Sequence, residues 1–346
     1  MDTTAKPDTQ THMRREIEEI PEAAARLLNG ASARIGDIAK QAGTPVFLAS
    51  VARGSSDHAA AFLKYAAEIH LGVAMASLGP SVSSVYKGRV NLSQALVIAI
   101  SQSGASPDIL SVVQSAKEQG AVTIGLTNTA GSELARLSTA SVDIHAGPER
   151  SVAATKSFVN SVLAGLLLLA EMAGDEALLE ALRQVPEQFE KAISMDWRAL
   201  AEPLEKRGSL YVIGRGPGLA IAHEAALKFK ETCRIHAEAY SSAEVMHGPV
   251  SIVEDGYPIL ALGVRDAAEA GLADAADRMA GQGGRVFATT ARVTRAEKLP
   301  FVSTTHPLTD ALVQIVSFYA FIEGFARRRG FNPDLPRHLK KVTQTV

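Results

Sequence analysis

The sequence predicts an α/β protein with two similar domains, each a parallel β-sheet sandwiched between layers of helices. Three observations predict this fold. Short apolar runs alternate with helical stretches along the chain, which is the pattern of a parallel sheet covered on both faces. The length of 346 residues favours two domains. The same dipeptide, Arg53-Gly54 and Arg215-Gly216, follows the first strand of each half, which indicates a duplicated unit.

The first half combines a leading helix with a regular alternation of strands and helices. A polar tail and a helical segment punctuated by Pro21 occupy residues 1–40. Each strand expected after them is a short apolar run that ends in small or polar residues. We expect strands at 46–52, 95–100, 121–127 and 141–146. We expect helices at 58–70, at 134–137 and at about 155–172, and one more helix that follows the strand at 95–100 and ends at 117. These elements form a first domain over residues 41–185.

The second half repeats the same rhythm. Connecting helices are expected over residues 175–208, punctuated by Pro186 and Pro203. We then expect strands at 209–214, 258–263 and 284–290, a helix from about 219, and a last helix at 308–329. These elements form a second domain over residues 186–335, followed by a tail over 336–346.

Composition and charge exclude several classes of partner. The formal net charge is −2, so the chain lacks the positive field that holds nucleic acid. The single cysteine, Cys233, excludes an intrachain disulfide and a thiolate metal cluster. The longest apolar run, 162–170, is far shorter than the roughly 20 residues of a membrane span, and the first residues lack the apolar centre of a signal peptide. We expect a cytoplasmic protein that binds neither membranes nor nucleic acid.

The segment Ser101-Gln102-Ser103-Gly104-Ala105-Ser106 is a candidate phosphate site. It lies where an expected strand ends and a helix begins, so free backbone N–H groups and the helix dipole favour an anion there. Ser55 and Ser56 stand at the equivalent place after the first strand, and loops at one edge of an open parallel sheet form a ligand crevice. An ordinary serine-capped helix is the alternative. Together the loops favour a phosphorylated small molecule, and without a Walker lysine a nucleoside triphosphate is not indicated.

A second candidate region is rich in titratable side chains. Residues 228–240 contain Lys228 and Glu231, and His247 follows at a Gly-Pro turn. A partly desolvated Glu or a His at a turn can move a proton, although such a charged run is more often a solvated helical face. The spacing of the histidines gives no zinc motif, so we expect no metal and no cofactor. Lys341 in the tail is either part of a soluble basic end or an amine that engages a sugar carbonyl.

In combination these segments resemble the sugar isomerase (SIS) family, and more closely the isomerase half of glucosamine-6-phosphate synthase and the SIS-type glucosamine-6-phosphate deaminase. The likeness covers nearly the whole chain. It rests on Arg53-Gly54-Ser55-Ser56, Ser101-Gln102-Ser103-Gly104, Val152-Ala153-Ala154-Thr155-Lys156, the run from His236 to Pro249, and the tail from Pro336 to Lys341. The resemblance implies two tandem SIS domains and a homodimer with shared active sites.

The resemblance also implies roles for individual residues. Glu231 would move a proton between C2 and C1 of the sugar, with Lys228 supporting it. His247 from the neighbouring subunit would assist ring opening, and Lys341 would engage the open-chain carbonyl. Substrate and phosphate contacts would come from Ser55, Ser56, Ser101, Gln102, Ser103, Ser106, Val152 and Ala153. Ser106 stands where the synthase has Thr, Met246 replaces a Lys and Lys340 replaces an Ala.

The chain also differs from the synthase at its start. Asp2 follows Met1, and about 45 residues precede the first strand, so we expect no glutaminase domain with a cysteine nucleophile. The expected reaction is therefore glucosamine 6-phosphate plus water giving fructose 6-phosphate plus ammonia. A fructosamine-6-phosphate deglycase or another SIS phosphosugar isomerase is the alternative. A non-catalytic sugar-phosphate sensor is a more distant one, because the N-terminal residues are too few and too acidic for a DNA-binding domain.

Overall fold

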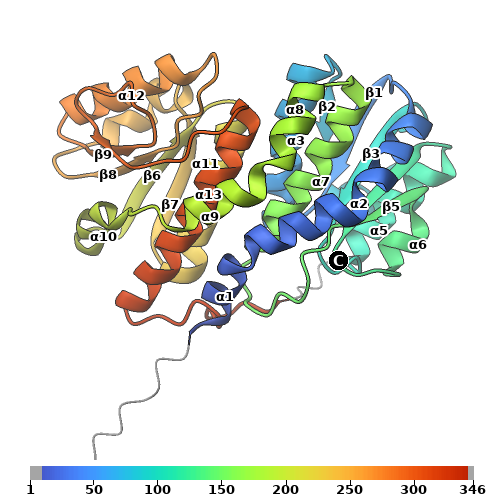
Figure 1. Cartoon of the computed structure of the whole chain (residues 1–346), viewed down its shortest axis with the longest axis horizontal. Helices are drawn as coiled ribbons and strands as arrows, with labels where there is room; N and C mark the ends of the chain where they lie inside the picture. The colour runs from blue at the N-terminus through green and yellow to red at the C-terminus, as the bar shows by residue number, and fades with distance from the viewer. Residues whose placement is uncertain (1–9, 342–346) are drawn as a thin grey trace, which may run out of the picture.

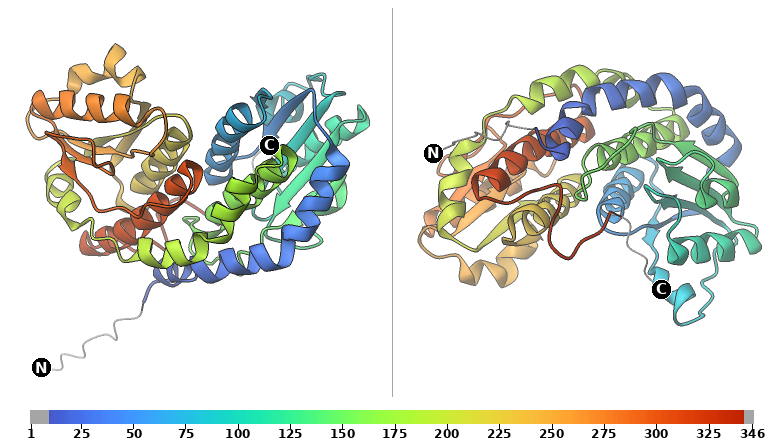
Figure 2. Two further views of the ribbon diagram at one scale, coloured as in Figure 1. Left: turned by 45° about the horizontal axis from the view of Figure 1, so that its top comes forward. Right: turned by 90° about the horizontal axis from the view of Figure 1, so that it is seen from below.

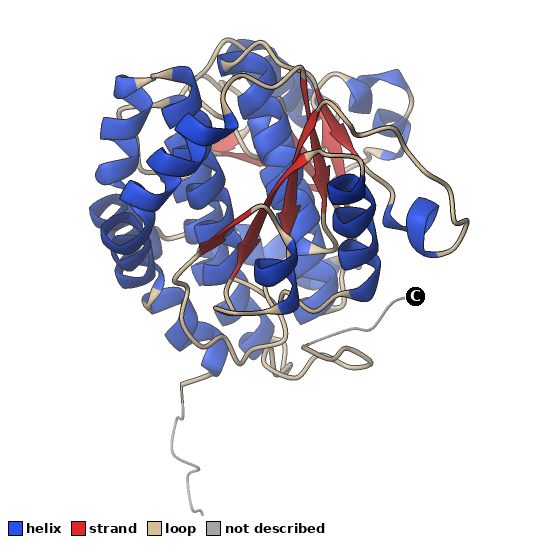
Figure 3. Ribbon diagram, turned by 90° about the vertical axis from the view of Figure 1, so that its right-hand side faces the viewer, coloured by secondary structure: helices blue, strands red, loops and turns tan. Residues whose placement is uncertain are grey.

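A computed structural model describes residues 10–341 of the chain and contains two sheets of five parallel strands, each covered by helices (Figure 1). The first sheet has the order β2-β1-β3-β4-β5 and the second the order β10-β9-β8-β6-β7. Figure 3 shows the strands enclosed between helices on both sides. The predicted α/β class and the three-layer arrangement are therefore confirmed.

The first domain contains the strands and helices that build the phosphate loops. Its strands are β1 (Phe47–Val51), β2 (Met75–Ser77), β3 (Ala95–Ile100), β4 (Val122–Thr127) and β5 (Ala140–Asp143). Its helices are α1 (His12–Glu18), α2 (Ile20–Ala42), α3 (Ser55–His70), α4 (Pro80–Ser84), α5 (Pro107–Glu118), α6 (Glu133–Leu137) and α7 (Lys156–Ala173). Pro21 lies in the first turn of α2, where its missing N–H costs nothing, and the helix continues through it.

The second domain repeats this plan after a set of connecting helices. Its strands are β6 (Ser209–Gly214), β7 (His236–Ser241), β8 (Pro258–Ala261), β9 (Arg285–Ala288) and β10 (Glu297–Lys298). The α-helices are α8 (Glu176–Arg183), α9 (Val185–Ile193), α10 (Ala201–Lys206), α11 (Pro217–Cys233), α12 (Glu269–Gly281) and α13 (Pro307–Arg328), and short 3₁₀ turns cover 198–200, 244–247 and 249–252.

The two domains are structural copies of each other. In both sheets the strand before the Arg-Gly dipeptide lies one position in from an edge, and the edge strand beside it is the next strand in the chain. Gly54 (φ 56°, ψ −132°) and Gly216 (φ 54°, ψ −131°) have the same backbone conformation. Because a positive φ strains any residue with a Cβ, both turns need glycine. The duplication inferred from the repeated dipeptide is confirmed.

A continuous apolar core joins the domains. Helices α3 and α11, which follow the two Arg-Gly turns, pack against each other across the domain boundary, and α13 packs on α11 and α9. Helices α7 and α13 are apolar and long enough to cross a membrane, but 83% and 89% of their apolar windows are buried inside the fold, as in core helices. Figure 2 shows these helices between the two sheets.

Three strands were not predicted from the sequence, namely β2, β7 and β10. Strands β2 and β10 are three and two residues long, too short to give a pattern. Strand β7 lies at a sheet edge and carries exposed polar residues such as His236 and Glu238, so it lacks the apolar run of a buried strand. After α13 the chain crosses back to the first domain (Figure 1), and the rest of the predicted tail, 342–346, lies outside the described residues, as do 1–9.

Candidate active site

A cleft of about 350 Å³ lies at the carboxyl ends of β1 and β3 in the first domain. These neighbouring strands have their crossovers on opposite sides of the sheet, which is the place where open α/β sheets bind ligands. The cleft is lined by Arg53, Gly54, Ser55, Ser56, Ile100, Ser101, Gln102, Ser103, Ser106, Ile109, Glu149, Val152, Ala154, Ser157, Phe158, Glu231, Leu339, Lys340 and Lys341. The structure thus brings together residues from both phosphate loops, the second domain and the tail.

The loop after β3 presents hydrogen-bond donors at the start of α5. Ser106 is the N-cap of α5, but its side chain makes no capping hydrogen bond, and its Oγ lies 3.4 Å from the Oγ of Ser101. The Oγ of Ser101 accepts from the N–H of Gly104 at 3.2 Å, which holds the loop in a tight turn. Hydroxyls and free N–H groups at a helix N-terminus form an anion site.

Gly104 is required by the shape of this loop. Its φ is +62°, and a Cβ there would lie 2.2 Å from Ser132 Oγ. We expect Gly104→Ala to cost about 1–3 kcal/mol of unfolding free energy and to raise the KM for a phosphorylated substrate about tenfold, because the loop must shift. Gly131→Ala is the control, since Gly131 has a φ of +68° with open space around it. Equal KM values for the two variants, measured by steady-state kinetics, would contradict this role.

Arg53 adds a positive charge beside the phosphate loops. Its guanidinium pairs with Asp108 in the first turn of α5 at 2.7 Å, and the Asp108 side chain is completely buried while that of Arg53 is half exposed. A buried carboxylate fixes the position of its partner because leaving the carboxylate unpaired is costly. Arg53 is therefore held at the cleft wall, where it can contact an anion.

In the same cleft a buried lysine holds the candidate proton-transfer group, Glu231. Lys228 Nζ donates to Glu231 Oε2 at 2.7 Å and to Ser55 Oγ at 2.9 Å, and it pairs with Glu224 Oε1 at 3.1 Å. Lys228 and Glu224 are fully buried, whereas the Glu231 side chain is 18% exposed and faces the cleft. The spacing of the three places them on one face of α11.

Glu224 completes this buried network. It also accepts from Ser55 Oγ at 3.1 Å and from the Tyr319 hydroxyl at 2.9 Å, and lies 2.9 Å from His58 Nδ1. Burial raises the pKa of Glu224, but Lys228 and these hydrogen bonds outweigh burial and lower it. Burial lowers the pKa of Lys228, but the two glutamates outweigh burial and raise it. Lys228 therefore stays an ammonium between two carboxylates.

The tail closes the cleft through an ion pair. Lys341 Nζ lies 2.8 Å from Glu149 Oε2 and donates to the Ser151 carbonyl at 2.7 Å. Glu149 is fully buried and accepts from the N–H groups of Thr155 and Ser157 and from Ser157 Oγ. These bonds fix the carboxylate, and the carboxylate holds the lysine of the tail in the cleft wall.

Because of this ion pair, the stability of the fold depends on pH in the acid range. Burial raises the pKa of Glu149, but Lys341 and the hydrogen bonds outweigh it, so the pKa is lowered below 4.5. The unfolded carboxyl therefore binds its proton at higher pH than the folded one, and stability present above pH 4.5 is lost as the pH falls through the lowered pKa.

We expect the melting temperature of the wild type to fall as the pH drops below about 4.5, and that of Glu149→Gln to fall less over the same interval. Glu190→Gln, at an exposed glutamate, serves as the control. A Glu149→Gln melting curve with the wild-type pH dependence would show that the pair contributes nothing to this behaviour.

Comparison with known proteins shows which family has this arrangement. The sequence profile of the SIS domain matches residues 48–171 and 203–295, one match over each sheet. The chain belongs to the SIS domain family. Its two SIS domains are the two structural copies described above, and the family resemblance read from the loops and the tail is confirmed.

Curated relatives of this SIS protein are glutamine–fructose-6-phosphate aminotransferases by name. The glutamine–fructose-6-phosphate aminotransferase of Thermococcus kodakarensis is 31% identical over 351 residues, which cover 95% of this chain and 57% of the relative. The enzyme of the same name from Pyrobaculum aerophilum is 36% identical over 259 residues, which cover 71% of this chain and 43% of the relative. The chain spans about half the length of the curated relatives it matches.

Solved structures share the fold over nearly the whole SIS protein. A protein from Silicibacter pomeroyi DSS-3, named as a phosphosugar isomerase, has a TM-score of 0.91 and 54% identity and covers 94% of this chain and 100% of its own. The C-terminal domain of glucosamine-fructose-6-phosphate aminotransferase from Francisella tularensis has a TM-score of 0.83 and 25% identity, covering 96% and 100%. Glucosamine-6-phosphate deaminase from Thermotoga maritima, with a TM-score of 0.79, 20% identity and coverage of 97% and 100%, shows the fold alone.

Most of the predicted site residues meet at the cleft, and a few lie elsewhere. Ala153 is completely buried in the core, and its neighbours Val152 and Ala154 line the cleft. Ser55 lines the cleft, but its hydroxyl is held by Lys228 and Glu224. His247 ends a 3₁₀ turn of the second SIS domain, is exposed, and does not line this cleft. Its predicted action from a second subunit stays a prediction.

Several polar residues of the site were not nominated from the sequence, among them Arg53, Glu149 and Glu224. Arg53 belongs to the Arg-Gly dipeptide, and only its contact with Asp108 shows that it faces the cleft. Glu149 precedes Val152 by three residues, without a motif of its own. The pairing of Glu224 could have been predicted from the sequence, because Glu224 precedes Lys228 by four residues and so lies on the same helix face.

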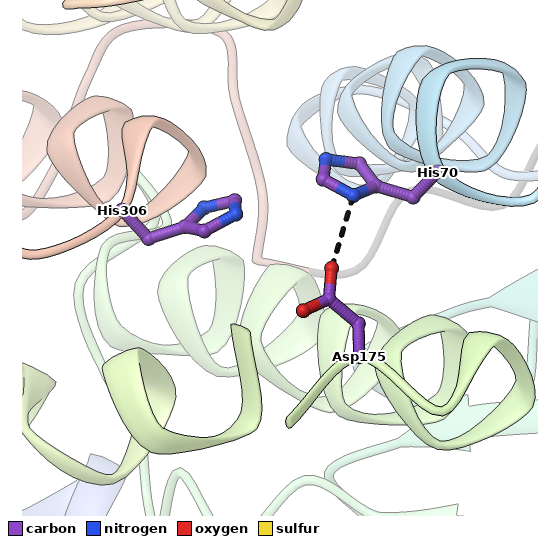
Figure 4. A group of neighbouring side chains, drawn as sticks. All are labelled: His70, Asp175 and His306. Carbon is purple, nitrogen blue, oxygen red and sulfur yellow. Dashed lines mark hydrogen bonds and ion pairs between the residues drawn. The ribbon is translucent and has the colours of Figure 1, made fainter. Parts of the chain in front are cut away.

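The histidines whose spacing gives no zinc motif lie in the segment 236–247. A different group that contains two histidines lies between the two SIS domains. His70, Asp175 and His306 bring their ligand atoms within 4.8 Å of one another, outside the cleft (Figure 4). His70 Nδ1 lies 3.2 Å from Asp175, which also caps α8, and His306 Nδ1 accepts from the N–H of Leu308. An imidazole that binds a metal through Nε2 carries its proton on Nδ1, so His306 would have to give up this bond to bind one there. Within the group, a hydrogen bond joins His70 at the end of α3 to Asp175 at the start of α8.

Proposed function

We propose that the chain is an aminosugar-phosphate isomerase and deaminase that converts glucosamine 6-phosphate and water into fructose 6-phosphate and ammonia. The observation that carries the proposal is the position of Glu231, a carboxylate held by a buried lysine in the same cleft that the two serine loops line. A sugar phosphate bound at the loops after β1 and β3 would extend toward Glu231 and the tail. Curated relatives with names from amino sugar synthesis support an amino sugar as substrate.

Proton transfer between neighbouring carbons is the central step of the proposed reaction. With the ring open, Glu231 removes the proton from C2 of the amino aldose, and the electron pair forms the C1–C2 double bond of an enaminol. Glu231 then returns the proton to C1, which leaves an imine at C2. Water adds to this imine, its oxygen becomes the ketone oxygen of fructose 6-phosphate, and ammonia leaves. Atoms balance without an oxidant or a cofactor.

The other polar residues support this sequence of steps. Lys228 stabilises Glu231 as a carboxylate before each proton transfer. Lys341 lies where it can polarise the open-chain carbonyl as an ammonium, and Glu149 is the carboxylate in place to take its proton if it forms a Schiff base. We further propose that His247 reaches the cleft of a second copy in a homodimer and assists ring opening, because it is exposed and lies outside the cleft of its own chain.

The direct test supplies purified protein with glucosamine 6-phosphate and measures ammonia and fructose 6-phosphate separately. Equal amounts of both products support the proposal. A second reaction supplies fructose 6-phosphate instead. Its conversion to glucose 6-phosphate, with no ammonia released from glucosamine 6-phosphate, would identify an aldose–ketose isomerase. Tight binding of sugar phosphates with no turnover of either would favour a sensor and overturn the proposal.

A further inference from the structure

A buried carboxylate joins helix α1 to the loop that carries Glu149. Glu16 of α1 is only 4% exposed. Its Oε1 accepts a hydrogen bond from the N–H of Arg150, and the N–H of Ser151 donates at 3.3 Å to each of its two oxygens. A buried carboxylate is costly unless it is hydrogen-bonded, and the same holds for buried N–H groups. Glu16 therefore fixes the loop at 149–152 against α1.

The loop at 149–152 also carries the contacts of Lys341. The carbonyl of Ser151 accepts from Lys341 Nζ at 2.7 Å, while the N–H of the same residue donates to Glu16. Glu149, two residues earlier, pairs with Lys341 at 2.8 Å, and Val152, one residue later, lines the cleft. The position of the tail lysine in the cleft therefore depends on where α1 holds this loop.

A second contact joins α1 to the segment that leads into the tail. The carboxylate of Asp334 accepts from the N–H groups of His12 at 2.8 Å and Met13 at 2.7 Å, which are unpaired donors in the first turn of the helix. The carbonyl of Asp334 accepts from the N–H of Val152 at 3.4 Å. Figure 1 shows the chain passing α1 as it returns from α13 to the first domain. Helix, loop and tail thus form a closed ring of hydrogen bonds.

We propose that Glu16 is a positioning residue that sets the place of Lys341 in the cleft through the loop at 149–152. Glu16 is not among the described residues that line the cleft, so it acts through the loop rather than on a bound molecule. Its effect on turnover rests on the proposed function, in which Lys341 engages the open-chain carbonyl. Its effect on the position of Lys341 does not, because these contacts are all within the chain.

The first experiment measures how accessible the Lys341 amine is. The purified protein is labelled with a limiting amount of acetic anhydride, and mass spectrometry gives the extent of acetylation at each lysine. Glu16→Ala should raise the labelling of Lys341 about tenfold, and Glu16→Gln, which keeps one accepting oxygen, about threefold. Lys228 is fully buried, so it reports global unfolding and should stay unlabelled. Glu18→Ala, at an exposed glutamate of the same helix, is the matched control and should leave the labelling of Lys341 unchanged.

The second experiment separates the tail lysine from the rest of the cleft. Glu16→Ala should lower kcat on glucosamine 6-phosphate by about 10- to 100-fold, the effect of misplacing a group that acts on the substrate. Glucitol 6-phosphate is a phosphorylated six-carbon polyol without a carbonyl, so its dissociation constant, measured by calorimetry, should be the same in Glu16→Ala and in the wild type. A general distortion of the cleft would weaken the binding of glucitol 6-phosphate as well.

The outcomes separate this inference from the proposed function. Wild-type labelling of Lys341 in both Glu16 variants overturns the positioning role. If Lys228 is labelled together with Lys341 in Glu16→Ala, the alanine variant unfolds and Glu16→Gln decides: labelling of Lys341 without Lys228 supports the role, and any other pattern overturns it.

The kinetic outcomes concern the link between this position and turnover. A more accessible Lys341 with wild-type kcat overturns that link, and so does weaker binding of glucitol 6-phosphate by Glu16→Ala. No turnover of glucosamine 6-phosphate by the wild type overturns the proposed function, and the labelling of Lys341 still decides whether Glu16 positions it.

Discussion

Glu231→Gln is expected to lower kcat on glucosamine 6-phosphate by about 10²- to 10⁴-fold, the range for removing a positioned acid–base group. Glutamine keeps the size of the side chain and can still accept a hydrogen bond from Lys228, so the cleft should keep its shape. An amide cannot take a proton from carbon, so the interconversion of aldose and ketose stops. KM should change little, because the groups expected to hold the phosphate lie on the loops after β1 and β3 and Glu231 is not one of them.

Two measurements make this prediction specific to proton transfer. Solvent deuterium should enter C1 of the product in the wild type and should do so far more slowly in the variant. Glu238→Gln, at an exposed glutamate on β7, provides the control and should retain wild-type turnover. If Glu231→Gln retained more than a tenth of wild-type kcat, another group would have to carry the proton.

The parts of the molecule that local sequence determines were predicted well. Strands β3 and β6 have the predicted bounds, because a buried parallel strand is a continuous apolar run that ends abruptly at a polar loop. The serine loop after β3 was predicted for the same reason, since the polar residues of a crevice must follow the strands that form it. Edge strand β7 was not predicted, because half of its environment is solvent and its residues are polar.

The contacts within the site depend on packing that a linear pattern does not contain. Ser55 and Glu224 meet only because α3 and α11, the equivalent helices of the two SIS domains, pack against each other. Lys341 and Glu149 are 192 residues apart in the chain and meet because the tail crosses back to the first domain. The resemblance nominated Lys341 and Lys228 for their chemistry, and the structure supplies the buried carboxylate that each one pairs with.

The buried lysine offers the second large expected effect. Lys228→Met removes the cation between Glu224 and Glu231 and should destabilise the protein by about 3–5 kcal/mol, the cost of leaving a buried charge without its partner. Turnover should fall as well, because Glu231 loses the ammonium that holds it as a carboxylate. Unfolding in urea, followed by circular dichroism, gives the free energy.

A double variant tells whether charge, rather than packing volume, is responsible. Methionine fills much of the space of the lysine stem, so a loss caused by volume would remain whatever Glu224 becomes. Glu224→Gln combined with Lys228→Met removes the unpaired buried carboxylate, and glutamine can still accept from Tyr319 and Ser55. The double variant should therefore be more stable than Lys228→Met alone while staying inactive. A double variant no more stable than the single one would mean that Lys228 acts through packing, and the charge network inferred for α11 would then be wrong.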